Sequence, residues 1–267
     1  MKTLIEQIDP NTITALLLRQ GAWLLQQQPA CAPHDLTAMQ DTFERCSGTV
    51  LQQLEMALSS HWPEIPFSHA EFDPEQQIKP EHPVYWICDP IDGAVQFLSG
   101  LPLWTLTLCL VIDAKPVMAF VYDPVAHAMY HALAGQGAFC NGRHLQVRHR
   151  DQLSLAVLGT SFPNYPQRPQ SEIDEFLRLL SKVIPQVFAQ RWMGPSSLSL
   201  AQLAEGKLDG YWETGRSLYD WLPGILIAQE AGAICSDIKG EKLDWSSDGI
   251  LFASPIIHSM LSTILMK

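Results

Sequence analysis

The sequence is poor in charged residues, and positive charge is the scarcer kind. Only 17% of its 267 residues are charged, and 17 Lys and Arg stand against 28 Asp and Glu, which gives a formal net charge of −11. Nucleic acids and anionic membranes are bound through clustered basic residues, so this balance predicts neither as a partner. The surplus of acids permits divalent-metal binding without requiring it, because most surface Asp and Glu are simply solvated.

Long apolar runs and paired cysteines are also missing. No stretch reaches the roughly 18 apolar residues that cross a bilayer. The N-terminus MKTLIEQIDPNT lacks the apolar region of a secretory signal peptide, so we expect a soluble cytoplasmic protein. The six cysteines form no CxxC pair, and their spacing fits neither a disulfide framework nor a zinc site. We expect reduced thiols, most of them buried.

The length fits one large domain or two closely packed ones. Apolar residues at helical spacing predict helices over 11–28 and 36–58, and a strand-rich block follows from about 84 to 150. In the second half a helix is expected from Ser171, with Ser171 as its N-cap. We place a boundary near 150, so that an N-terminal half, 1–150, and a C-terminal half, 151–267, pack as one globular unit.

The most informative segment is the end of a predicted buried strand, which reads Trp86-Ile-Cys-Asp-Pro-Ile-Asp-Gly93. Pro90 stops strand pairing and Gly93 permits a sharp turn, so Asp89 and Asp92 lie three residues apart at the strand end. Such oxygen ligands suit Mg²⁺ or Ca²⁺, often with a backbone carbonyl. An Asx-turn after a strand explains the same residues without any ligand, and both interpretations stay open.

A short helix is expected directly after Gly93. Free amides at its start would face an anion held against the cation. Metal-binding carboxylates beside anion-binding amides favour phosphoester hydrolysis, in which paired cations lie ~3.5–4 Å apart.

Two separated segments carry a resemblance to a known family. WICDPIDGAVQFLSGLP resembles the central signature of the inositol monophosphatase family, and the segment from Tyr219 to Gly232, YDWLPGILIAQEAG, resembles its C-terminal signature. GQGAFCNGRHLQV resembles a typical hairpin of the family, and DLTAMQD extends the likeness over essentially the whole chain. The resemblance implies an α-β-α-β-α sandwich of the inositol monophosphatase and fructose bisphosphatase type. It also implies two or three Mg²⁺ ions, inhibition by Li⁺, and a homodimer.

The resemblance also implies roles for individual residues. The implied metal ligands are Glu71, Asp89, Ile91 through its carbonyl, Asp92, Asp220 and Asp41. The implied substrate contacts are Gly93, Ala94, Glu213 and Ser196, and the implied catalytic residues are Glu71, Asp89 and Asp92. Simpler interpretations remain for three of them, because Asp220 can be the N-cap of a helix starting at Trp221, and Glu213 and Asp41 can be surface acids.

Two alanines stand where the family has reactive groups. The family's Gly-Glu-Glu triplet is matched by His69-Ala70-Glu71, so by straight register the ligating glutamate falls on Ala70, and Glu71 reaches the metal only after a shift of one residue. His69 is either a replacement ligand or a loop histidine. Ala94 replaces a threonine that orients the attacking water, and losing such a group typically costs about 10²–10⁴ in rate.

The sequence therefore predicts a Mg²⁺-dependent phosphomonoesterase that acts on a small phosphorylated polyol, sugar or related metabolite. A first alternative is a catalytically impaired family member that binds a phosphorylated metabolite or a partner protein. A second is a family scaffold recruited to non-hydrolytic chemistry.

Overall fold

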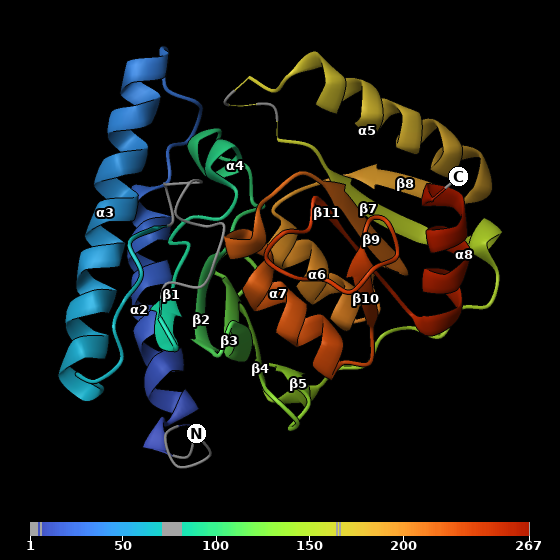
Figure 1. The fold of residues 1–267 in the computed structure, drawn as a ribbon. Helices are drawn as coiled ribbons and strands as arrows, with labels where there is room; N and C mark the ends of the chain where they lie inside the picture. Colours follow the sequence, from blue (N-terminus) through green and yellow to red (C-terminus); the bar gives the residue numbers. More distant parts are fainter. Residues whose placement is uncertain (1–4, 6, 71–81, 164, 166, 267) are drawn as a thin grey trace.

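The computed structural model describes residues 5, 7–70, 82–163, 165 and 167–266. It is built of five layers in which helices and sheets alternate (Figure 1). Helices α2 (Pro10–Gln27) and α3 (Leu36–His61) cover the first sheet. Helices α6 (Ser196–Ala204) and α7 (Leu218–Glu230) lie between the two sheets, and α5 (Gln170–Val183) and α8 (Pro255–Leu265) cover the second sheet. The predicted α-β-α-β-α sandwich is confirmed.

The first sheet is antiparallel throughout and follows chain order, β1-β2-β3-β4-β5-β6. Its strands are β1 (Val84–Ile87), β2 (Leu106–Ile112), β3 (Lys115–Asp123), β4 (Ala128–Leu133), β5 (Ala138–Cys140) and β6 (Arg143–His144). The short helix α4 (Ala94–Leu98) lies between β1 and β2 in the chain.

The second sheet is mixed and has the order β10-β11-β9-β7-β8. Strand β7 runs parallel to both of its neighbours, and the other two pairings are antiparallel. Its strands are β7 (Val157–Ser161), β8 (Ala189–Trp192), β9 (Gly210–Thr214), β10 (Ile234–Asp237) and β11 (Gly249–Ala253). Two 3-10 helices, Leu153–Leu155 and Ile184–Gln186, flank β7 and β8 in the chain.

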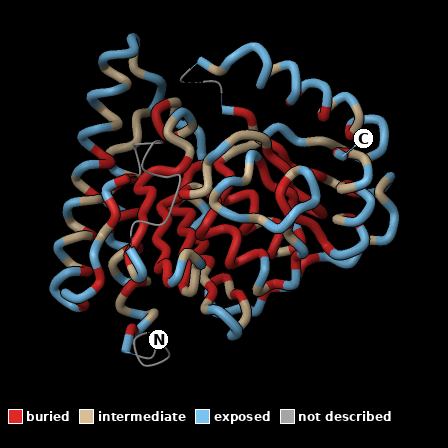
Figure 2. Tube along the Cα trace, in the orientation of Figure 1, coloured by how far each residue is buried: buried red, intermediate tan, exposed pale blue. Residues whose placement is uncertain are grey.

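Side chains on both faces of the first sheet are buried, because helices cover both faces. Along β2, Leu106, Leu108 and Leu110 pack against α2 and α3, whereas Cys109 and Val111 face the α6–α7 layer. This alternation follows from the two-residue period of a strand. Burial is accordingly concentrated in the sheets and in the helices between them (Figure 2).

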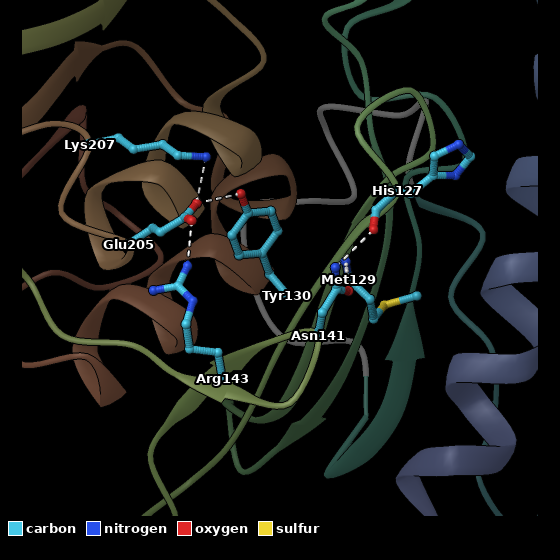
Figure 3. Close-up of polar contacts among 7 residues, drawn as sticks. All are labelled: His127, Met129, Tyr130, Asn141, Arg143, Glu205 and Lys207. Atoms are coloured by element: carbon cyan, nitrogen blue, oxygen red, sulfur yellow. Dashed lines mark hydrogen bonds and ion pairs between the residues drawn. The ribbon is translucent and has the colours of Figure 1, made fainter.

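The far edge of the first sheet is fastened to the end of α6 by a polar cluster around Glu205 (Figure 3). The Tyr130 hydroxyl donates to Glu205 Oε2 at 2.9 Å, and Arg143 Nη2 donates to Oε1 at 2.5 Å. Lys207 Nζ lies 2.7 Å from Oε2. Asn141, in the turn between β5 and β6, accepts from the Met129 amide at 2.9 Å and donates to the His127 carbonyl at 3.0 Å, near the start of β4.

Three further expectations can be compared with the structure. All six cysteines are free, and Cys31 is the exposed one. Helix α5 begins at Gln170 with Pro169 at the N-cap position, so the prediction that Ser171 caps it is wrong. The Pro169 carbonyl accepts from the amides of Glu172 at 3.0 Å and Ile173 at 3.3 Å, so Ser171 already lies within the first turn. In the described part of the chain, no helix has the length and apolar character needed to cross a membrane.

Candidate active site

The chain turns sharply after β1 and places two aspartates in the interior. Asp89 and Asp92 are each only 8% exposed. The Ile91 amide donates to Asp89 Oδ1 at 2.8 Å, so the predicted Asx-turn is present. The backbone of Asp92 pairs with Thr105 in both directions at 2.9 Å, which ties the turn to the segment that precedes β2.

Glycine is required directly after this turn. Gly93 has φ of +95°, and an added Cβ would lie 3.0 Å from the Leu103 carbonyl oxygen and 3.3 Å from Pro195 Cδ. Helix α4 begins at the next residue, as the sequence predicts. The first amides of a helix have no acceptor within the helix, and the Ala94 amide is the first one of α4.

The second signature brings another aspartate to the same place. Helix α7 begins at Leu218, so Asp220 lies inside its first turn, and the interpretation that Asp220 is the N-cap of a helix starting at Trp221 is wrong. Asp220 is half-buried. Burial is the largest cause of the raised pKa of Asp89 and of Asp92, and the negative charge of Asp220 raises both further. Asp220 therefore lies close enough to Asp89 and Asp92 for its charge to act on both.

Glu213 is a fourth carboxylate at this site. It lies on β9 with 3% exposure, and the Tyr211 hydroxyl donates to its Oε2 at 2.5 Å. Burial, with smaller contributions from Asp220 and Asp92, raises the pKa of Glu213 to about 8. The alternative interpretation of Glu213 as a surface acid at a strand end is wrong.

The site is thus dominated by like charges in a desolvated space. Burial raises the pKa of Asp89 well above its ordinary range, with Asp92 and Asp220 adding to the effect. The pKa of Asp92 rises to about 8 and that of Asp220 to about 6, chiefly through burial. Arg168, on the loop before α5, opposes this by lowering the pKa of Asp220. Such a cluster is relieved either by protonation or by a cation.

The donor chemistry fits Mg²⁺, because hard carboxylate oxygens and a backbone carbonyl at Ile91 are the ligands this ion prefers. Within residues 7–70, 82–163 and 167–266, however, no group of three His, Cys, Asp or Glu side chains comes close enough to hold one ion. Glu71, a predicted ligand, falls outside the described residues. The fit therefore rests on the chemistry and mutual repulsion of the carboxylates.

The other predicted residues take different positions. Ser196 is buried at the start of α6, next to Gly194 and Pro195, whereas Asp41 is exposed on α3. Ala70 is fully buried, and the neighbouring Ser68 amide bonds to the Trp86 carbonyl of β1 at 2.8 Å. His69 is an exposed histidine outside the helices and strands, and its Nε2 lies 3.1 Å from Glu55 Oε1.

Sequence reasoning missed four residues that contact or influence these carboxylates: Thr105, Arg168, Ser197 and Tyr211. Only Tyr211 had a usable signal, since it stands two residues before Glu213 on a strand and so shares its face. The others come close only through the tertiary fold.

A family model described as the inositol monophosphatase family matches residues 24–266. The chain belongs to the inositol monophosphatase family. An inositol-1-monophosphatase of Mesorhizobium japonicum is 33% identical over 182 residues, which cover 68% of this chain and 67% of the relative. A Nus factor SuhB of Pseudomonas aeruginosa is 36% identical over 155 residues, 58% of this chain and 57% of the relative.

Solved structures of the inositol monophosphatase family agree with the observed layers. The SuhB structure from Mycobacterium tuberculosis has a TM-score of 0.77 at 27% identity and covers 94% of this chain and 92% of its own. The extragenic suppressor protein SuhB from Bartonella henselae has a TM-score of 0.79 at 24% identity, with 96% and 98% covered, and shows the shared fold. The family is one of phosphatases, and two kinds of name, inositol-1-monophosphatase and Nus factor, occur among the relatives.

Proposed function

We propose that this chain is a Mg²⁺-dependent phosphatase that hydrolyses the phosphate monoester of a small polyol, sugar or related metabolite. The observation that carries the proposal is the clustering of Asp89, Asp92, Asp220 and Glu213, in which the charge of Asp220 raises the pKa of the other three and the charge of Asp92 raises that of Asp89 and Glu213. Carboxylates gathered at this cost in desolvation are expected to serve a ligand, and a hard cation is the ligand that relieves them.

In this proposal Asp89, Asp92, Asp220 and the Ile91 carbonyl would supply oxygen ligands to the two or three bound cations that the sequence predicts, with no three of these side chains on one ion. Bound Mg²⁺ supplies positive charge that offsets the negative charge of the phosphate and of the oxygen that leaves. The amide of Ala94, which has no acceptor within α4, and that of Gly93, the N-cap residue, would bind phosphate oxygens.

Two further residues are proposed to bind the alcohol part of the substrate. Glu213 accepts a hydrogen bond from Tyr211 on Oε2, which fixes its orientation, and its other oxygen can accept from a substrate hydroxyl. Ser196 stands at the start of α6, where its hydroxyl can contact the same group. The catalytic role of Glu71, the third-ion role of Asp41, the Li⁺ inhibition, the homodimer and the cytoplasmic location stay predictions.

The test is phosphate release from inositol 1-phosphate and a panel of sugar phosphates, with and without Mg²⁺. We expect Asp220→Asn to lower kcat/KM by about 10²-fold or more, since a ligand and its charge are lost. Wild-type protein that binds Mg²⁺ but releases phosphate from none of these esters would contradict the proposal.

Asp123→Asn is the matched control for Asp89→Asn. Asp123 is the last residue of β3, and Asp89 follows the last residue of β1 by two positions. Asp123 likewise precedes a proline, is 6% exposed and accepts backbone amides in a turn, from Val125 at 3.0 Å and Ala126 at 2.9 Å. The two variants disturb equivalent turns. Only Asp89→Asn is expected to abolish turnover.

A second candidate function is partner or metabolite binding by a member with reduced catalysis, and Ala70 and Ala94 favour it. The structure makes Ala94→Thr the sharper test, because Ala94 is half-buried at the start of α4 whereas a glutamate at position 70 would put a carboxylate into the apolar core. A slow wild type that Ala94→Thr accelerates about 10²–10⁴-fold supports impairment. An efficient wild type contradicts it.

A further inference from the structure

Helix α6 takes its N-terminal cap from a distant part of the chain. Pro195 occupies the N-cap position and offers no side-chain acceptor. Asp92, 105 residues away from Ser197, fills this role, because the Ser197 amide donates to Asp92 Oδ2 at 3.2 Å. Ser197 is the second residue of α6, and its amide is one of those that an N-cap side chain normally accepts from.

The Ser197 hydroxyl makes a second hydrogen bond to the same oxygen, Asp92 Oδ2. When Asp92 is ionised, as it must be to hold a cation, its carboxylate only accepts, so the hydroxyl is the donor. Thr105 Oγ1 lies 2.8 Å from Ser197 Oγ, and with the serine proton directed to Asp92, the Thr105 hydroxyl donates to Ser197. The Thr105 and Ser197 side chains are fully buried.

Asp92 is therefore held in two ways by the same pair of residues. Thr105 pairs with its backbone in both directions, and Ser197 fixes its carboxylate. Hydrogen bonds to an ionised acceptor are the stronger kind, and a chain of donors strengthens each member. In the described part of the chain, both donors fall on Oδ2, so Oδ1 remains for another ligand.

We propose that Ser197, supported by Thr105, is a positioning residue that orients the Asp92 carboxylate for the cation. The inference rests on the cation binding of the proposed function and not on the identity of the ester. Partners of metal ligands typically change metal affinity by about 10–100-fold when they are removed.

Ser199 shows that a buried serine on α6 has no need of a carboxylate. It lies two residues further along, is also fully buried, and donates to the Pro195 carbonyl of its own helix at 2.9 Å. Ser199→Ala thus matches Ser197→Ala in helix, burial and chemistry, and differs in the partner that loses its hydrogen bond.

The experiment measures Mn²⁺ binding to the full chain by titration calorimetry, with Mn²⁺ as the probe for the site. We expect Ser197→Ala to weaken Mn²⁺ binding about 10–100-fold and Ser199→Ala to leave it unchanged. In the phosphatase assay, Ser197→Ala should raise the Mg²⁺ concentration for half-maximal rate by a similar factor, with little effect on kcat at saturating Mg²⁺. Thr105→Val should weaken binding in the same direction, and Thr105→Ser should restore it.

Equal Mn²⁺ affinity of Ser197→Ala and wild type would overturn the inference, and so would a wild type that binds no Mn²⁺. If Ser197→Ala does not fold, Thr105→Val tests the same hydrogen-bond chain from the other side, and unchanged affinity there overturns it equally. A wild type whose Mn²⁺ binding depends on Ser197, but which hydrolyses no phosphate ester, supports the inference and contradicts the proposed function.

Discussion

Replacing Glu213 by glutamine should change stability in a way that depends on pH. The pKa of Glu213 is about 8 in the folded protein against an ordinary value of 4.5. Between these values the folded protein keeps a proton that the unfolded chain has released, so the wild type loses stability as pH rises through this range. A glutamine has no proton to lose, and the variant lacks this contribution to the pH dependence.

The size of the effect follows from the two pKa values. One unit of pKa corresponds to about 1.4 kcal/mol, so ionising Glu213 in its buried position costs the wild type about 3–5 kcal/mol above pH 8. Near pH 5, where folded Glu213 is protonated, both side chains are neutral and both can accept from Tyr211. The variant should then match the wild type within about 1 kcal/mol.

The assay is urea unfolding in the presence of EDTA at about pH 5.5 and about pH 8.5. We expect Glu213→Gln to be clearly more stable than wild type at the higher pH only. A stability difference that is the same at both pH values would refute the reasoning, because it would mean that Glu213 does not titrate in this range.

Glu205→Gln is a control for which the pH dependence of the stability change is expected to have the opposite direction. Burial raises the pKa of Glu205, but Lys207, Tyr130 and Arg143 together outweigh it and lower the net value. Its contribution to stability is therefore present at neutral pH and lost as pH falls through the folded pKa. Glu205→Gln should destabilise the protein at neutral pH, and the difference should shrink in acid.

Three further predictions concern packing, a buried ion pair and metal. Gly224→Ala should cost about 1–3 kcal/mol in urea unfolding, because the new Cβ would lie 2.7 Å from Leu200 Cβ where α7 crosses α6; an unchanged midpoint would contradict this. Asp209→Asn should cost about 1–3 kcal/mol, since Asp209 is 1% exposed and accepts from Arg150 at 2.9 Å and from the Val157 amide at 2.8 Å; a thermal melt equal to that of the wild type argues against it. Mg²⁺ should raise the melting temperature relative to EDTA, and more at about pH 8.5 than at about pH 5.5, because the cation relieves carboxylates that are ionised mainly at the higher pH; a smaller rise at the higher pH would count against a cation in this cluster.

Local sequence rules predicted the elements of the fold well. Helical spacing found α2 and α3, and the Asn141-Gly142 pair marks a tight hairpin in which both residues have positive φ, 48° and 79°. Helix starts were less predictable. Both Ser171 and Asp220 lie inside their helices, because α5 begins at Gln170 and α7 at Leu218, in each case without a side-chain hydrogen bond from the N-cap residue.

The residues of the site also differ in how far the sequence alone predicts them. Asp89, Asp92 and Gly93 were recognisable because strand, turn and helix start lie within a few consecutive residues. Glu213 and Asp220 needed the resemblance, because nothing local relates them to a strand more than 100 residues earlier. Ser197 and Thr105 could not be predicted, since their roles exist only where the two segments meet at 2.8 Å.

The helix layer between the sheets has a consequence for any attempt to divide the molecule. Tyr85 and Val121 of the first half pack in the same apolar cluster as Tyr211 and Phe252 of the second half, and α6 and α7 supply the residues between them. A fragment ending near residue 150 would keep the first sheet and lose the helices that cover one of its faces. The halves are therefore separable in sequence but interdependent in folding, and we expect complementary fragments to be insoluble alone and to reassemble only when they are produced together.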